Sequence, residues 1–564
     1  MKVKLPKELK GVKFPKILTI DMNDFDIDVF LPTLFYTILS QGRGKAKRTN
    51  DPEAIQGYID KLSHNHVMQG FDDRVGRKVL EHLVRTTLIT TGGIGRAKQG
   101  EQITSIVPYT LLAHKPGFPL KGSRHRGADT FIYQALRENM HRADRELLEA
   151  VKIIFGRGVN IGDMPDLGGS YDGKTELDTL TRLSIAFLDG FDNTRTGLSR
   201  EKSEIPACPK LADELATDLL RYLFEYYKRM PSQAFTYNLL ALINFELFNY
   251  TLKLVYAINE LVQNPETLPS AMRDPLEPST PQLYLDFTQD VRGRSHEMAK
   301  ACVRRDIEAY QQFLYSNVLL RLLDSYTKLL SFNKQRKVKI DAILDGSVSG
   351  PFYLQGLLFL RDDPTLSIYF ETHTNIDMEN IRKENAVPND VGDDVDEEEL
   401  SWLDDIANVA DTDIERLVNL LVEGQRDSAL QHFVKWYWSV GGIKKTHGLL
   451  AGSTRSRASW RYAPSNDLLA VLVQVAAARL SSQGIQSIRL QEFLQFLEKR
   501  YGILIDRPPD MFKGAEYIAA AHDNLRAMQN RLRQMGIFRD LSDDFTIQRL
   551  HPPYTDITLK TVEA

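Results

Sequence analysis

One short segment of the chain matches the consensus of a nucleotide-binding phosphate loop. Residues 168–175 have the sequence GGSYDGKT, which satisfies G-x-x-x-x-G-K-[ST]. In such loops backbone N–H groups and the lysine surround the phosphates at a helix N-terminus, and the hydroxyl group binds magnesium. The candidate nucleotide-binding residues are therefore Gly173, Lys174 and Thr175. Asp172 places a negative charge where the phosphates would lie, so a glycine-rich turn before a helix is the favoured interpretation.

A second segment carries positive charge without any acid. Residues 102–128 contain no Asp or Glu, and the basic side chains that could bind phosphates there are Lys121, Arg124 and Arg126. Together with His125 they could also serve a nuclease, but metal-dependent phosphodiester cleavage usually requires grouped carboxylates as well. The acids that follow, Asp129, Glu138 and Asp144, are only loosely spaced. A solvated basic loop is the competing and favoured interpretation.

A third basic segment lies in the C-terminal part of the chain. Residues 428–466 contain six Lys/Arg, no Asp or Glu, and three of the four tryptophans. Cations without internal counter-charges favour a polyanion, because each phosphate contact releases condensed counterions. Glycine and serine residues let the backbone approach phosphates, and Trp460 could stack on an exposed base. The predicted phosphate contacts are Lys444, Lys445, Arg455, Arg457 and Arg461.

A predicted helix over residues 514–535 adds side chains that could recognise bases. Its apolar residues recur at alternating steps of three and four, and Gly536 follows where a helix C-terminal glycine belongs. Asn, Gln and Arg can make bidentate contacts with base edges in a major groove. On the polar side of this helix the residues predicted to face a duplex are Asn524, Arg526, Asn530 and Arg533.

Composition limits the class of protein that positions these residues. A chain of 564 residues is too long for one core, and we expect roughly two to four domains. Only two cysteines occur, which indicates a reducing compartment and excludes a disulfide framework. No uninterrupted apolar run reaches the roughly 18 residues of a membrane span. We therefore expect a cytoplasmic protein without a membrane segment, and the sequence predicts no cofactor, no metal site and no catalytic residue.

Charge and periodicity divide the chain into five parts. Residues 387–405 hold nine acids and no base, which predicts a mobile acidic linker. The predicted parts are a loop-rich helical N-terminal domain at 1–205, a helical bundle at 206–345, a β-hairpin region at 346–386, the linker at 387–405, and a basic helical domain at 406–564. The fold class is thus mainly α and multidomain, with a central helical bundle and a small β-hairpin.

The last hundred residues have the order of a winged helix-turn-helix. Residues 466–481, 489–501 and 514–535 are predicted helices, and residues 537–550 could form a short hairpin after them. The run 462–469 (YAPSNDLL), the end of the third helix and the terminal Pro552-Pro553-Tyr554 resemble the C-terminal parts of uncharacterised bacterial proteins from anti-phage defence islands. That resemblance covers about the last fifth of the chain and implies a component of a multi-protein system acting on or near DNA.

These observations predict a non-enzymatic DNA-binding or scaffolding subunit of a bacterial multi-protein system, with DNA and other subunits of that system as partners. Two alternatives stay open. The first is an enzyme, either a phosphate-loop NTPase or a metal-dependent nuclease component. The second is a scaffold that binds protein only and docks its basic domain on an acidic partner.

Overall fold

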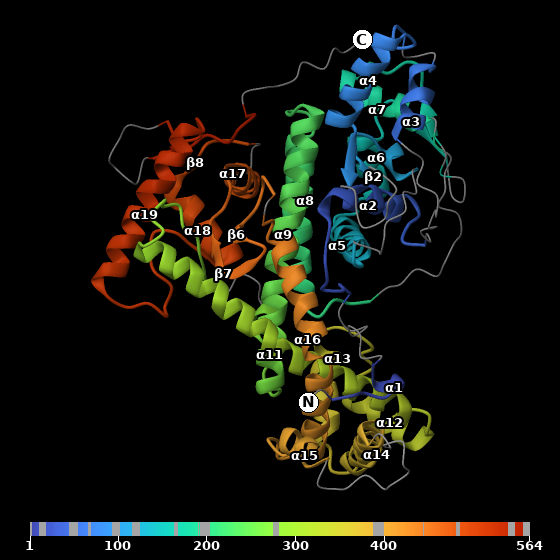
Figure 1. Ribbon diagram of the computed structural model, residues 1–564, viewed down its shortest axis with the longest axis vertical. Helices are drawn as coiled ribbons and strands as arrows, with labels where there is room; N and C mark the ends of the chain where they lie inside the picture. Colours follow the sequence, from blue (N-terminus) through green and yellow to red (C-terminus); the bar gives the residue numbers. More distant parts are fainter. Residues whose placement is uncertain are drawn as a thin grey trace.

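The computed structural model confirms that the chain is mainly helical (Figure 1). The structure describes residues 3–10, 19–43, 55–65, 69–92, 102–115, 125–162, 167, 169–189, 191, 204–273, 281–386, 400–443, 445–480, 485–539 and 548–555. The strands within these residues are short and pair into two-stranded sheets, so helix packing forms most of the core. Among the described residues, the helices all lack the combination of length and apolar character that crossing a bilayer demands.

The N-terminal third forms a lobe of short helices and two hairpins. Helix α1 (Lys7–Lys10) lies apart from this lobe (Figure 1). The helices of the lobe are α2 (Phe30–Leu39), α3 (Ile55–Ser63), α4 (Arg74–Thr87), α5 (Ala128–Arg142), α6 (Leu147–Phe155) and α7 (Thr179–Asp189), with single 3-10 turns η1 (Ile27–Val29) and η2 (Leu111–His114). The antiparallel hairpins are β1 (Ile89–Gly92) with β2 (Gln102–Ile106), and β3 (Val159–Ile161) with β4 (Gly169–Tyr171). This lobe lies against one side of α8 and α9 (Figure 1).

Long helices form the centre of the molecule. They are α8 (Pro209–Tyr226), α9 (Ser232–Gln263), α11 (Arg294–Leu330) and α16 (Asp413–Val440). Prolines mark the starts of the first two helices. Pro209 occupies the first turn of α8, and Pro231 is the residue before α9, where it interrupts the helical chain between α8 and α9. The short α10 (Ser270–Arg273) follows α9.

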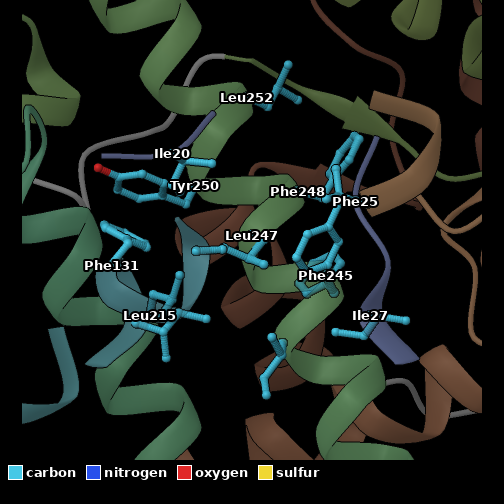
Figure 2. Close-up of a cluster of buried hydrophobic side chains, with 14 of the residues drawn as sticks. Ile20, Phe25, Ile27, Phe131, Leu215, Phe245, Leu247, Phe248, Tyr250 and Leu252 are labelled. Atoms are coloured by element: carbon cyan, nitrogen blue, oxygen red, sulfur yellow. The ribbon is translucent and has the colours of Figure 1, made fainter. Parts of the chain in front are cut away.

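Helix α9 is buried on nearly every side. Figure 2 shows its residues Phe245 to Leu252 between two sets of partners. Phe131 of α5 and Leu215 of α8 lie on one side, and Phe25 with Ile27 from the N-terminal segment lie on the other. A helix that is apolar all round belongs in the middle of a bundle, because no face of it gains by contact with water.

A lower group of helices replaces the predicted β-hairpin. Residues 346–386 form α13 (Pro351–Asp362) and α14 (Ser367–Asn385), beside α12 (Lys334–Ile343) and α15 (Ser401–Ala407), so the hairpin prediction is wrong. A short apolar run does not distinguish a buried strand from a buried helix. The signals that decide it are helix starts: Pro351 in the first turn of α13, and the Asp363 carboxylate, which accepts the N–H groups of Thr365 and Leu366 before α14.

The C-terminal part contributes three helices and several short strands. The helices α17 (Asn466–Leu480), α18 (Leu490–Tyr501) and α19 (Ala515–Gln534) lie within a residue or two of the predicted ranges. Before them, β6 (Leu450–Ser453) and β7 (Ser456–Tyr462) form an antiparallel hairpin. Strand β8 (Ile488–Arg489) pairs with β10 (Arg549–Leu550), and β9 (Ile503–Leu504) runs parallel to β5 (Leu283–Tyr284).

Buried charge joins the C-terminal helices to the central bundle. The Arg500 guanidinium of α18 donates through Nε to Asp218 Oδ2 of α8 at 2.7 Å, and through Nη2 to Glu246 Oε2 of α9 at 3.0 Å. The Tyr501 hydroxyl bonds both carboxylates, at 3.0 and 2.9 Å. Lys253 of α9 donates to the backbone carbonyl of Arg500 at 2.6 Å. Each member is almost completely buried, so each depends on its partners for its hydrogen bonds.

The predicted parts of the chain interleave in space. Helix α16, predicted to belong to the C-terminal domain, packs against α9 and α11 of the bundle, and α17 packs against α8 and α9. The division of the chain into five parts therefore stays a prediction made from the sequence. Of the predicted linker, residues 387–399 lie outside the described residues, and residues 401–405 belong to α15.

Candidate nucleic-acid interface

The β6–β7 hairpin places two arginines of the basic segment 428–466 on the surface. Its register shifts between Ala451 and Ser453, which lets the strands bend around the turn at residues 454–455. Arg455 and Arg457 are exposed, and no ion pair of either is seen in the part of the chain that the structure describes. Both side chains can therefore reach an anion without first breaking a contact.

The other basic residues of this segment are placed differently. Lys445 forms an ion pair with Asp28, with Nζ and Oδ2 2.6 Å apart. The Arg461 side chain is half-buried, and its Nε lies 3.6 Å from Asp286 Oδ2. Lys444 lies outside the described residues. Two of the predicted phosphate contacts thus have acidic neighbours from distant parts of the chain, and their positive charge is partly compensated.

The aromatic residues of the segment belong to the core. Trp460 is 2% exposed, and its indole Nε1 donates to the carbonyl oxygen of Ser453 at 2.7 Å. Trp436 is fully buried and donates to Thr251 Oγ1 at 3.0 Å. The hypothesis that Trp460 stacks on an exposed base is wrong, because its ring closes the base of the hairpin instead.

Asn524 is buried, which contradicts the prediction that it faces a duplex. Its amide Nδ2 donates to the carbonyl oxygens of Leu285 and Ile505, at 2.8 and 3.0 Å, and its Oδ1 accepts the N–H of Phe287 at 2.7 Å. The side chain is 0% exposed. The buried stripe of α19 runs through Ala521, Asn524, Met528 and Leu532, so this asparagine lies inside a face assigned to apolar residues only.

The remaining predicted residues of α19 are exposed. Arg526 pairs with Asp523 one turn earlier, but both side chains are largely in solvent. Arg533 donates to Asn530 Oδ1 at 2.9 Å, and its guanidinium lies over the Phe538 ring. A solvent-exposed pair of this kind contributes little free energy, so these side chains can exchange partners easily. The polar face of α19 is therefore open to a ligand.

The second basic patch is largely outside this surface. Arg126 holds the N-terminal segment: its Nε donates to the carbonyl oxygen of Asp24 at 2.9 Å, and its Nη1 to Asp21 Oδ2 at 3.2 Å. The nearby His125 Nδ1 lies 2.6 Å from Asp129 Oδ1. Lys121 and Arg124 lie outside the described residues. Arg126 thus acts as a structural contact within this lobe.

The phosphate-loop match adopts a different geometry. Strand β4 is half of an antiparallel hairpin, and α7 begins only at Thr179. The N–H groups of Lys174 and Thr175 both donate to Asp172 Oδ1 at 2.9 Å, and the Thr175 hydroxyl donates to the other oxygen. Gly173, at a φ of 76°, makes this turn. The groups that would bind a phosphate are taken up by the neighbouring carboxylate, which agrees with the turn interpretation.

Sequence reasoning missed the acid at the centre of the C-terminal contacts. Asp286 follows β5, more than 170 residues before the Arg461 that it contacts, and nothing in its local sequence marks it. Within the described residues, no group of three or more His, Cys, Asp or Glu side chains is arranged to hold a metal ion.

Comparison with known proteins places the chain. A family model described as methylation-associated defense system protein MAD7 matches residues 7–554. The chain belongs to the MAD7 family. The predicted resemblance to defence-island proteins was correct in kind but too narrow, since MAD7 membership covers nearly the whole chain and not the last fifth alone. No curated protein and no solved structure matches the chain.

Membership of the MAD7 family indicates a component of a methylation-associated defence system, and with it a set of other components as neighbours.

Proposed function

We propose that the chain is a DNA-binding or scaffolding subunit of its defence system that brings duplex DNA to the other components. The observation that carries the proposal is the exposure of Arg455 and Arg457 on one element and of Arg526 and Arg533 on another within the same C-terminal part. Paired cations on neighbouring elements can follow a sugar–phosphate backbone, whose charge supplies most of non-specific affinity.

The order of elements supports a winged-helix interpretation of this part. Helix α17, strand β8, helices α18 and α19 and strand β10 come in the order of that fold, with the short β9 added between α18 and α19, and β8 pairs with β10. A bridge between Phe538 and Leu550 adds a third short segment to this pairing. In this interpretation α19 is the recognition helix, and Asn530 and Arg526 face the major groove.

A salt-dependent binding titration tests the proposal. We expect the protein to bind a fluorescein-labelled duplex with a steep negative slope of log K against log salt, because each phosphate contact contributes about 0.9 to that slope. The double variant Arg455→Glu and Arg457→Glu should bind about tenfold or more weakly with a smaller slope. The matched control, Arg74→Glu with Lys78→Glu on α4, carries the same charge change on exposed residues of the N-terminal lobe and should bind like wild type.

The outcome that contradicts the proposal is equally direct. If the duplex does not bind, or binds with a salt-insensitive affinity, the exposed arginines serve something else. Retention of an acidic partner protein by the wild type, lost in the double variant, would then assign the same surface to protein docking.

A further inference from the structure

A polar junction forms where β7, the first turn of α11 and α19 meet the segment after β5. At its centre, Asp286 is 2% exposed. Its Oδ1 accepts from the N–H and the hydroxyl of Thr288, at 2.9 and 2.7 Å. Its Oδ2 is buried and accepts no hydrogen bond from any described residue, although Arg461 Nε and His296 Nδ1 each lie 3.6 Å away. At that distance neither nitrogen makes a true hydrogen bond.

The cationic side chains around this carboxylate outnumber it. Arg531 of α19 lies over the Phe287 ring and donates through Nη1 to the carbonyl oxygen of Pro464 at 2.9 Å. Burial lowers the pKa of Arg531, and Asp286 opposes this only in part. Burial and the charge of Arg461 also lower the pKa of His296. Asp286 Oδ2 thus lies near Arg461 and His296, and the charge of Asp286 also acts on Arg531. One carboxylate therefore compensates the two guanidinium groups only in part in this partly desolvated place.

We propose that this junction binds one phosphate of the nucleic-acid backbone, with Arg461 and Arg531 as its donors and His296 as a third donor once protonated. Asp286 competes for the same donors and holds Arg461 while the junction is empty. This inference rests on the proposed function and locates one contact of it.

The position of the junction favours a backbone phosphate over a free one. Arg461 is on the hairpin that carries Arg455 and Arg457, and Arg531 is on the helix that carries Arg526 and Arg533. A phosphate at the junction therefore meets one arginine from each of these two elements. A continuous backbone that leaves the junction along the hairpin also gains from Arg455 and Arg457, whereas a single phosphate ion meets only the junction.

The sign of one substitution separates this proposal from a purely structural role. Asp286→Asn removes the competing charge and keeps the shape, so we expect duplex binding to strengthen roughly threefold to tenfold. Arg461→Met and Arg531→Met should each reduce the salt slope by about one, as loss of one phosphate contact does, while Arg461→Lys keeps the slope. If Asp286 merely supports the fold, Asp286→Asn weakens binding, and that result overturns the proposal. Thermal melting of each variant confirms that it folds.

A pH series tests the histidine. Asp286 from the segment after β5, Arg461 from β7 and Lys300 from α11 are the charged groups that act on His296, and Arg531 of α19 lies beside Asp286. A phosphate favours the protonated imidazole, so the duplex should bind more tightly as the pH falls from 8 to 6. His296→Gln should remove this dependence, and an unchanged dependence in that variant counts against the proposal.

Further binding measurements separate a backbone phosphate from a free phosphate ion, and they test the junction separately from the proposed DNA-binding function. If inorganic phosphate at low millimolar concentration displaces the duplex from wild type but sulfate does not, the junction is a free-phosphate site, and its assignment to a backbone is overturned. If Arg455→Glu with Arg457→Glu loses slope while Arg461→Met and Arg531→Met keep it, the proposed function stands and the junction fails. If wild type binds no duplex, both fail.

Discussion

At the scale of single residues, Asn524 connects three chain segments through one side chain. Its amide bonds backbone groups of Leu285, Phe287 and Ile505, and no water can replace these contacts at a site that is 0% exposed. We expect Asn524→Ala to lower the free energy of unfolding by roughly 2–4 kcal/mol, because it leaves several buried backbone groups unpaired. Denaturation in urea measures this, and Asn530→Ala on the exposed side of α19 should change it by less than about 0.5 kcal/mol.

Lys253 gives a second prediction at this scale. Burial lowers the pKa of Lys253 from 10.5 to about 7. Between these values the unfolded chain binds a proton that the folded protein does not, so this group makes stability rise with pH from about 7 to 10.5. Below about 7 its effect is constant. Lys253→Met should remove this contribution, so the free energy of unfolding should rise more steeply with pH in the wild type than in the variant between pH 7 and pH 9.5. If the free energy of unfolding has the same slope against pH in both proteins, Lys253 is not a neutral amine in the folded protein.

At the scale of elements, the contact of α18 with α8 and α9 depends on Arg500. Its guanidinium bonds Asp218 and Glu246 where all three are almost inaccessible to water. Arg500→Met leaves the buried Glu246 without its cation and leaves Asp218 with Arg479 alone, whose Nε lies 3.3 Å from Asp218 Oδ1. We expect a loss of about 3–5 kcal/mol in the free energy of unfolding. The control is Arg507→Met, which removes the exposed ion pair with Glu498 and should cost less than about 1 kcal/mol. Faster amide hydrogen exchange confined to α17 and α18 would show which elements separate.

Element types were predictable where a helix is long or carries its own end signals. The ranges predicted for α17, α18 and α19 agree with the structure within a residue or two, and Gly536 after α19 has the positive φ of 72° that a helix C-terminal glycine adopts. The β-hairpin predicted for residues 346–386 was wrong because a short apolar run fits the period of a strand as well as the period of a helix. Burial of Tyr353, Leu357 and Leu358 within one helix, against neighbours distant in sequence, decided the period there.

At the scale of the whole molecule, α16 belongs to the bundle although a predicted linker precedes it. Its buried residues, among them Leu417 and Trp436, pack against α9 and α11. A chain cut between residues 386 and 400 should therefore stay assembled, since α14 ends before the cut and α15 begins after it. We expect the two pieces, expressed together, to elute as one complex in size-exclusion chromatography.

The same packing predicts the behaviour of the C-terminal piece alone. Residues 400–564 without the bundle leave the apolar faces of α16 and α17 uncovered, and β9 loses its partner β5. Such a fragment should aggregate or remain unfolded, because the area it would bury lies mainly on the missing helices. A fragment that is monomeric and shows cooperative unfolding would mean that residues 400–564 form an independent domain, as the sequence predicts.

The sequence alone determined the mainly helical class and the concentration of cations without nearby acids in residues 428–466, because these depend on local pattern and composition. Tertiary structure alone decided which polar groups serve the fold. Asp28 neutralises Lys445 from 417 positions away, Asp286 lies beside Arg461 although the two are distant in sequence, and the position of Asn524 on α19 directs its side chain inward. Partners so far apart leave no periodic trace, since folding brings them together through contacts that neither local sequence contains.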